Sequence, residues 1–524
     1  MKSILISITV LLLTIPSAWP QASTGRVSGT VYDKSGAVIP AAQVSITNSG
    51  TNVSSTTRTT ESGRYVVPGV TPGPYRLVVE SAGMKKYEVD FDVQVQQSVV
   101  IDPVLEVGST ATEVEVTSVV PMTTVDSAVV SQTLERARVE QLPINGRGLK
   151  TLLAVIPELD DMRALGAPEG ATEFVLDGSA TVTQRWSNHS TLAGMLDTIQ
   201  ELRLDSNATS SKYSRPTTLV MSTRSGSNRF HGSAFETNRN SGFGVARQRQ
   251  DTFSKPPHMV RNEFGLSAGG PVYIPQVYNG KNRTFWFAGY EANRQYWANT
   301  VGWQVPTMAM RQGDFSQMVQ SDGRQPVLYD PWSTNATTFT RQPFSDGGVL
   351  NRIPAQRMSP LAKYLFGITP QPTTAANPLV ENNWWGTAPA GDLIWSISTR
   401  VDHHLSDKDQ IFGRYSQSTH TELGVSGGQI MLNNVNGTMY TIYPSKTLAF
   451  NYVRTFTPTL INELLVSGYK NYYWNGPGGE RKDWAGQLGL PNPSTWTVFP
   501  RSGPPAWVTT PSPPTWCRGT RQRS

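Results

Sequence analysis

The stretch Ile397-Ser398-Thr399-Arg400-Val401-Asp402 decides the fold class of this chain. Its odd-numbered positions are apolar or weakly polar, and its even-numbered positions are polar or charged. Because successive side chains of a strand point to opposite faces, this period of two predicts a strand with one apolar and one polar face. The same alternation recurs over Leu448–Tyr452.

Eight segments with many aromatic and glycine residues follow Asn228 and are predicted as strands. They are Asn228–Asn240, Asn262–Ile274, Arg283–Arg294, Tyr296–Pro306, Ile394–Leu405, Gln410–His420, Lys446–Phe456 and Ile461–Tyr473. Segments of about ten residues with apolar-out, polar-in alternation are typical of outer-membrane barrels. A large soluble β-sandwich has the same period, so the alternation alone leaves both architectures open.

The composition favours a turn-rich β protein. Only 16% of the 524 residues are charged, beside 45 Gly and 37 Pro, which argues against coiled coils and helical bundles. The net charge of +6 is dilute and forms no Lys/Arg stripe, so we expect no nucleic-acid partner. The single cysteine, Cys517, excludes an intramolecular disulfide and a multi-cysteine metal site.

The N-terminus indicates export. Met1-Lys2 precedes the apolar run Ile4–Ile15 and then a segment of small residues, the order of a signal peptide over residues 1–22. No later stretch reaches the roughly 18 apolar residues of a spanning helix, so any membrane insertion is expected to use strands.

Two domains are expected between the signal peptide and the aromatic strands. Residues 25–107 show short alternating runs, the clearest being Val89–Val95, separated by Gly, Pro and Asn turns, which predicts a β-sandwich. After a linker at 108–133, residues 134–225 mix a helical pattern with short strands, and Val175-Leu176 runs into a tight Asp177-Gly178 turn.

Several strings in this order resemble one family. They are Val27–Asp33, Gly36–Ala42, Leu142–Arg147, Val175–Gly178, Ser225–Ser233, Asn262–Leu266 and Arg311–Ser316. The chain resembles the TonB-dependent outer-membrane receptors of the Oar type. The resemblance implies a mainly β fold: an N-terminal carboxypeptidase regulatory-like, carbohydrate-binding-like β-sandwich, an α+β plug domain, and an incomplete antiparallel outer-membrane β-barrel over 226–490. It assigns the plug motif to Leu142, Pro143, Asn145, Gly146, Arg147, Leu176, Asp177 and Gly178.

The chain departs from the family pattern at three places. Pro216 interrupts a stretch that leads into a strand in the family, and Gly148 follows Arg147 where the family has Asn or Asp. Transporters of this kind close about 22 strands, whereas only eight are predicted here. Residues 491–524 are Pro-rich and strand-free, so we expect a truncated or frameshifted reading frame.

No catalytic, cofactor-binding or metal-binding pattern is found, and we expect no enzyme activity. The six histidines form no zinc-peptidase string, and the adjacent pair His403-His404 is expected to point to opposite faces of a strand. Asp177-Gly178 suits a turn better than a carboxylate site.

The segment Glu113, Val114, Glu115, Val116 and Thr117 is the candidate TonB box. The resemblance implies that this acidic-aliphatic pentapeptide adds as a strand to a sheet edge of a TonB-type energy transducer. The alternative, that it is the last strand of the sandwich, stays open.

Energised uptake of a ligand through the outer membrane is the expected function. The partners are a TonB-type transducer, outer-membrane lipid, and an unidentified ligand, for which a carbohydrate or a siderophore-sized molecule is a candidate. The alternative is a secreted or surface-attached protein whose sandwich binds carbohydrate or another partner.

Overall fold

A computed structural model describes the part of the chain on which the following rests. The described residues are 24–108, 114–115, 130–141, 146–148, 152, 159–160, 163–164, 172–181, 196–206, 213, 215, 217–243, 258–424, 439–457, 460–471 and 474–477. The chain divides into two units. One comprises Met1–Thr300, Thr387–Ser426 and Thr438–Gly476, and the other comprises Val301–Gly386, Gly427–Gly437 and Pro477–Ser524.

The N-terminal part of the first unit is a β-sandwich. One sheet has the order β5-β1-β8, the other β10-β7-β6-β3-β4, and β2 pairs with β9. The strands are β1 Gly25–Thr30, β2 Tyr32–Asp33, β3 Gln43–Asn48, β4 Ser54–Arg58, β5 Arg64–Val70, β6 Gly73–Glu80, β7 Tyr87–Val93, β8 Ser98–Val100, β9 Val104–Leu105 and β10 Val114–Glu115. Their alternate apolar side chains face inward, as the period of two predicts.

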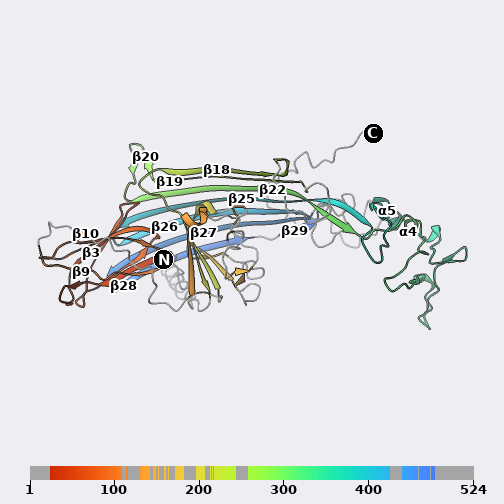
Figure 1. The fold of residues 1–524 in the computed structure, drawn as a ribbon, viewed down its shortest axis with the longest axis horizontal. Coiled ribbons are helices and arrows are strands. Elements are labelled where there is room, and N and C mark those ends of the chain that lie inside the picture. The colour runs from red at the N-terminus through yellow and green to blue at the C-terminus, as the bar shows by residue number, and fades with distance from the viewer. Residues whose placement is uncertain are drawn as a thin grey trace, which may run out of the picture. The chain divides into compact units, whose positions relative to one another are not determined.

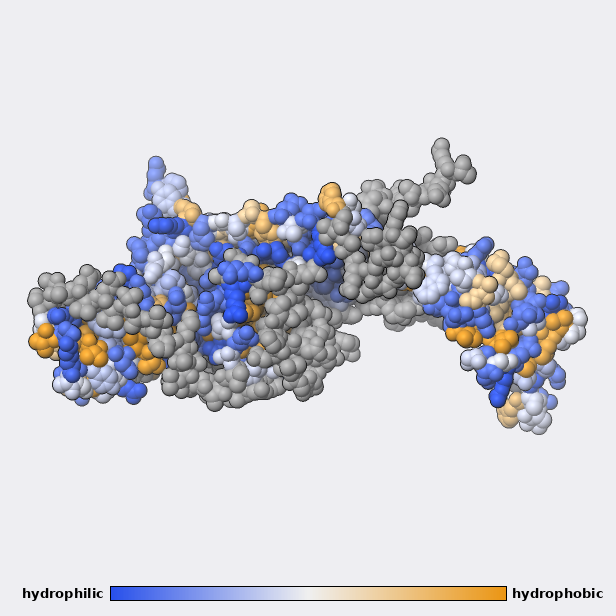
Figure 2. All heavy atoms as spheres, viewed as in Figure 1, coloured by the Kyte–Doolittle hydropathy of each residue, from blue (hydrophilic) through white to orange (hydrophobic). Residues whose placement is uncertain are grey.

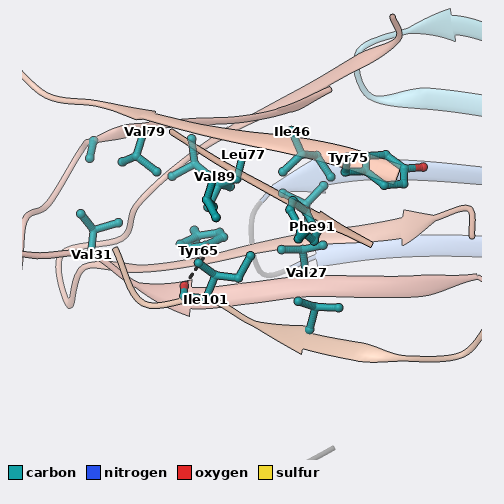
Figure 3. Close-up of a cluster of buried hydrophobic side chains, with 14 of the residues drawn as sticks. Val27, Val31, Ile46, Tyr65, Tyr75, Leu77, Val79, Val89, Phe91 and Ile101 are labelled. Atoms are coloured by element: carbon teal, nitrogen blue, oxygen red, sulfur yellow. Dashed lines mark hydrogen bonds between the residues drawn. The ribbon is translucent and has the colours of Figure 1, made fainter. Parts of the chain in front are cut away.

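The sandwich core is apolar apart from the hydroxyls of two buried tyrosines (Figure 3). Val27 and Leu77 have no exposed surface, and Phe91 lies near Tyr75 at a ring-centroid distance of 6.0 Å. Tyr65 is also buried, and its hydroxyl donates a 2.8 Å hydrogen bond to the carbonyl oxygen of Ile101. Burial raises the pKa of the Tyr65 hydroxyl far above its ordinary value.

A five-stranded mixed sheet of order β11-β16-β17-β14-β15 forms the expected α+β part. Its elements are β11 Val130–Glu135, α2 Arg136–Gln141, β14 Thr172–Leu176, β15 Ser179–Ala180, the 3-10 turn η1 Leu196–Thr198, β16 Ile199–Ser206 and β17 Thr217–Thr223, beside the small pair β12 Leu159–Asp160 and β13 Arg163–Ala164. Every residue of β14 and β17 is buried, so both faces of the sheet are covered. Phe174, Leu202 and Leu219 lie in its core.

Long antiparallel strands follow and form an eight-stranded sheet of order β18-β19-β22-β25-β26-β27-β28, with β29 paired to β27 (Figure 1). They are β18 His231–Asn240, β19 Met259–Pro271, β22 Thr284–Trp303, β25 Trp384–Ser406, β26 Asp409–Gly424, β27 Met439–Thr457, β28 Leu460–Asn471 and β29 Trp474–Pro477. A small hairpin, β20 Tyr273–Ile274 with β21 Tyr278–Asn279, lies between β19 and β22. Within the described residues this sheet is open, with β18 and β28 at its ends.

One strand prediction is wrong. The segments Arg283–Arg294 and Tyr296–Pro306 were expected to be two strands, but most of both belongs to the single strand β22. The residue between the two segments is Gln295, and not a Gly or Pro that would favour a turn. The pairing of β22 with β19 continues past it without a break, as far as Met259 opposite Trp297.

The predicted alternation of the long strands is confirmed. Ser398 and Arg400 on one face of β25 are 2% and 5% exposed, whereas Ile397 and Val401 on the other are 37% and 46% exposed. Leu448 on β27 is likewise exposed. The fold class is therefore mainly β, with a sandwich, an α+β plug and an incomplete barrel sheet.

The second unit contains the connection between β22 and β25. Its elements are α4 Met308–Arg311, η3 Pro331–Ser333, β23 Ser345–Asp346, β24 Val349–Leu350, η4 Ala355–Arg357 and α5 Pro360–Ile368. The Arg311 guanidinium donates hydrogen bonds of 2.6 and 2.8 Å to the carbonyl oxygens of Phe366 and Thr369, which ties α4 to the end of α5. Hydrophobic residues gather in patches on the surface of this unit (Figure 2), and Trp332 and Phe339 are 80% and 83% exposed.

Within the described residues, no helix has the length and apolar character needed to cross a membrane.

Candidate functional site

Asp177 and Gly178 form the two-residue turn of the β14–β15 hairpin, as predicted. Leu176 pairs with Ser179 across it. Both turn residues have positive φ, 46° for Asp177 and 81° for Gly178, which is the type I′ geometry that matches the twist of the flanking strands. Asp-Gly suits this turn because Asp tolerates positive φ and Gly adopts it without strain.

The same turn buries a carboxylate. Asp177 is 1% exposed, and its two oxygens accept hydrogen bonds from the backbone N–H (2.9 Å) and the hydroxyl (2.6 Å) of Thr223 at the end of β17. Two arginines of the long strands also reach it. Arg400 Nη1 of β25 lies 3.1 Å from Asp177 Oδ1, and Arg414 Nε of β26 lies 2.8 Å from Asp177 Oδ2.

We call Asp177, Thr223, Ser225, Arg400, Asp402 and Arg414 the Asp177 cluster. Asp402 accepts from Arg400 Nη2 at 2.8 Å and from the Ser225 hydroxyl at 2.6 Å. Two carboxylates thus face two guanidiniums, and the cluster is neutral overall. Removing one partner of a buried ion pair typically lowers the free energy of unfolding by about 3–5 kcal/mol, because the other charge is left buried and uncompensated.

A second group of charges, centred on Asp197 in η1, joins the plug to the sheet. Arg136 Nη2, at the start of α2, lies 2.6 Å from Asp197 Oδ1, and the Ser233 hydroxyl of β18 donates to Asp197 Oδ2 at 2.9 Å. Burial raises the pKa of the Asp197 carboxyl, but the hydrogen bonds from Arg136, Ser233 and Ser267 and the charge of Arg136 lower it by more, so the carboxyl titrates below its ordinary range.

Two residues of the predicted plug motif, Gly146 and Arg147, lie at this second group. Arg147 Nη2 lies 3.4 Å from Asp197 Oδ1, and the Arg147 backbone N–H donates to Glu263 Oε1 of β19 at 2.9 Å. Gly146 has φ of 103°, and a Cβ there would meet Glu263 Oε1 at 3.2 Å. Leu142, Pro143 and Asn145 lie outside the described residues.

The candidate TonB box is described only at its centre. Val114–Glu115 is strand β10, which pairs in parallel with β7, Val114 opposite Tyr87 and Glu115 opposite Glu88. The segment thus lies as an added edge strand of the sandwich sheet. Glu113, Val116 and Thr117 lie outside the described residues.

The sandwich also contacts the plug through a buried carboxyl. Glu201 of β16 accepts a 2.7 Å hydrogen bond from the backbone N–H of Val95. Burial, together with the negative charges of Glu135 and Asp92, raises the pKa of Glu201 to about 7, against the opposing effect of the Val95 hydrogen bond.

A cavity of about 330 Å³ opens beside the Asp177 cluster. Residues of the sandwich, the plug and the sheet line it, among them Tyr75, Gln200, Arg224, Asp402 and His404. Polar and apolar groups are mixed in this lining, which includes Arg400 and Asp402 of the cluster.

Sequence reasoning missed Arg414, Asp197 and Glu263. Their partners are distant in the sequence, so no local spacing reveals them. The sequence did contain one indication of these contacts, namely charged residues on the polar face of the alternating strands. A charge on a face that becomes buried requires a partner of opposite charge. Arg400 and Asp402 carried that signal and were assigned to the polar face of their strand.

Comparison with known proteins agrees with this architecture. Residues 222–514 match the family model of the outer membrane beta barrel domain, and residues 26–106 match that of the carboxypeptidase regulatory-like domain. The TonB-dependent transporter Oar of Myxococcus xanthus is 25% identical over 298 residues, which are 52% of this chain and 27% of that protein. The chain thus spans about a quarter of the length of this relative.

Solved structures are similar only in part. The siderophore receptor PirA from Acinetobacter baumannii aligns with 65% of this chain and 43% of its own, at 12% identity and a TM-score of 0.33. A catechol 1,2-dioxygenase from Acinetobacter sp. ADP1 aligns with 19% of this chain and 60% of its own, at 14% identity and a TM-score of 0.15. Neither score supports an argument about fold or function. The sequence matches do: this chain belongs to the outer membrane beta barrel domain family, is of the TonB-dependent receptor type, and is a protein of the outer membrane.

Proposed function

We propose that this chain takes part in energised ligand uptake, in which a TonB-type partner pulls on the segment Glu113–Thr117 and thereby displaces the plug. The observation that carries the proposal is the Asp177 cluster, in which a turn of the plug is held to two strands of the sheet by buried ion pairs. Ion pairs of this kind hold a closed state firmly and release it without covalent chemistry.

The topology of the plug sheet suggests the order of events. β11 is the first plug strand after the Glu113–Thr117 segment, and it lies at one edge of the sheet, paired only with β16 among the described strands. Asp177 lies at the opposite edge, in the β14–β15 turn. Arg136 follows β11 directly, so a pull on β11 would load the Arg136–Asp197 pair before it reaches Asp177.

The outer-membrane family match favours uptake over the alternative of a secreted carbohydrate- or partner-binding protein. We thus propose three things together: that a ligand is transported, that a TonB-type protein is the partner, and that Glu113–Thr117 is the segment it binds.

Binding of the partner tests the proposal. Strand addition uses the backbone N–H of the added segment, so Val114→Pro should abolish binding of the periplasmic domain of TonB to the purified chain. Val114→Ala keeps the N–H and should bind within about twofold of the unmodified chain. Equal binding of the Pro and Ala variants, or no binding of the unmodified chain, would overturn the proposal.

A further inference from the structure

Three side chains with metal-ligating atoms lie close together on the face of the long-stranded sheet that also carries Arg400 and Arg414. We call this the inner face, and the three side chains lie on it at a distance from the Asp177 cluster. They are Asp392 on β25 and His420 and Glu422 on β26, and one ligand atom of each lies within 4.8 Å of the other two. His420 Nε2 is 3.3 Å from Asp392 Oδ1 and 3.8 Å from Glu422 Oε1.

Strand register brings the three together. Asp392 is directly opposite Glu422, and His420 is opposite Ile394, two residues further along β25. Because side chains two residues apart in a strand share a face, all three lie on the same inner face as Arg400 and Arg414. Their side chains are 24% to 43% exposed, so a dissolved ion can reach them.

A neighbouring tyrosine orients one of the carboxylates. Tyr443 of β27 is opposite His420 in the register, and the two rings lie 5.4 Å apart. The Tyr443 hydroxyl donates a 3.2 Å hydrogen bond to Glu422 Oε2, which leaves Oε1 directed at His420. Partners of this kind, which fix a ligating carboxylate from behind, are a regular part of metal sites.

The ligand set selects the class of ion. At metal–ligand distances of about 2.0–2.2 Å, tetrahedral geometry separates two ligand atoms by roughly 3.3–3.6 Å. The distances of 3.3 and 3.8 Å from His420 Nε2 to the two carboxylate oxygens are close to this range. Imidazole nitrogen suits zinc and similar transition metals, whereas magnesium and calcium prefer oxygen ligands alone. We propose that Asp392, His420 and Glu422 form a binding site for a divalent transition-metal ion of the Zn²⁺ class, with a fourth position open.

The position of the site suggests its use, and this step rests on the proposed function. Asp392 precedes Arg400 by eight residues along β25, which is about 26 Å of strand. It lies on the side away from the short turn at Asp407–Lys408, and outer-membrane barrels place short turns on the periplasmic side and long loops outside. An ion entering from outside would therefore meet this site before the Asp177 cluster, so the site lies on the entry side of the proposed uptake path.

Direct metal binding tests the site without transport. The full chain, purified in detergent without a histidine tag, is titrated with Zn²⁺ against a fluorescent chelator and with Co²⁺ by visible absorption. We expect one ion per chain, at least a tenfold weaker affinity for His420→Gln and Asp392→Asn, and an unchanged affinity for His258→Gln, which alters an exposed histidine elsewhere. Tyr443→Phe keeps all three ligands and should weaken binding by about 10–100-fold.

Two results would overturn the site: no stoichiometric binding, or binding that His420→Gln and Tyr443→Phe leave unchanged. Circular dichroism of each variant shows whether it has folded. If His420→Gln has not folded, the metal affinity of Tyr443→Phe tests the site instead. Metal binding does not require TonB, so loss of TonB binding with intact metal binding removes the proposed function alone. Loss of metal binding with intact TonB binding would refute only the metal site.

Discussion

Arg414 Nε lies 2.8 Å from Asp177 Oδ2, and neither side chain has any exposed surface. One residue belongs to the turn of a plug hairpin and the other to the inner face of β26. Arg414 Nη2 donates a 3.2 Å hydrogen bond to the carbonyl oxygen of Leu176, so one guanidinium contacts both the carboxylate and the backbone of the turn. The contact joins the plug to the sheet at a point that local sequence patterns do not reveal.

Replacing the carboxylate should release this contact. Asp177→Asn keeps a residue that tolerates positive φ, but it leaves Arg400 and Arg414 buried with less negative charge, so we expect a loss of about 3–5 kcal/mol in the free energy of unfolding. Urea titration followed by tryptophan fluorescence measures it. The control Asp322→Asn alters a carboxylate whose side chain is 49% exposed beside Arg324, where at most about 1 kcal/mol is expected. Equal, small losses for the two variants would contradict the role of Asp177.

The turn itself requires glycine. Gly178 has φ of 81°, and Gly178→Ala should cost about 1–2 kcal/mol because a Cβ clashes in the left-handed region. Thermal unfolding measures the effect. Gly367→Ala in α5 is the matched control, since nothing lies within 4 Å of its Cβ position and alanine is the better helix former, so it should stabilise by up to about 1 kcal/mol. A stabilising Gly178→Ala would show that the turn geometry is wrong.

The contact of sandwich and plug at Glu201 should depend on pH. The pKa of Glu201 is raised to about 7 from an ordinary 4.5, so its contribution to stability is fully present below about pH 4.5 and is lost as the pH rises through 7. Glu201→Gln stays uncharged and should remove this loss, so that unfolding curves at pH 5 and pH 8 differ less than those of the unmodified chain. Glu61→Gln, in an exposed turn of the sandwich, should keep the original profile. A Glu201→Gln profile like that of the unmodified chain would refute the assignment.

The outer face of the long strands should be sensitive to charge. Leu448 is 58% exposed on the outer face of β27, where a membrane protein meets lipid, and Leu448→Lys should destabilise the inserted state by up to about 2–4 kcal/mol. Recovery of folded protein from outer-membrane fractions measures this. Val380→Lys, in the second unit and 49% exposed, should be recovered like the unmodified chain. Normal recovery of Leu448→Lys would mean that this face does not meet hydrocarbon.

Strand periodicity predicted the fold class and the two faces of β25 and β27, because a period of two is a local property of the backbone. It did not show that β22 is one strand, since only pairing with β19 decides whether a strand continues past Gln295. The Asp177-Gly178 turn was predicted from its turn chemistry, but its partners Arg400 and Arg414 were not. Their positions follow from docking of the plug on the sheet, which joins residues more than 200 positions apart.

A double-mutant cycle between Asp177 and Arg414 tests the central claim that buried ion pairs hold the plug to the sheet. Asp177→Asn and Arg414→Gln are measured singly and together, as free energies of unfolding of the full chain. Each single variant should lose about 3–5 kcal/mol, and the double variant should lose less than the sum by about 1–3 kcal/mol, because a neutral pair leaves no uncompensated charge between them. Losses that add within about 0.5 kcal/mol would show that the two residues act independently and would contradict the claim.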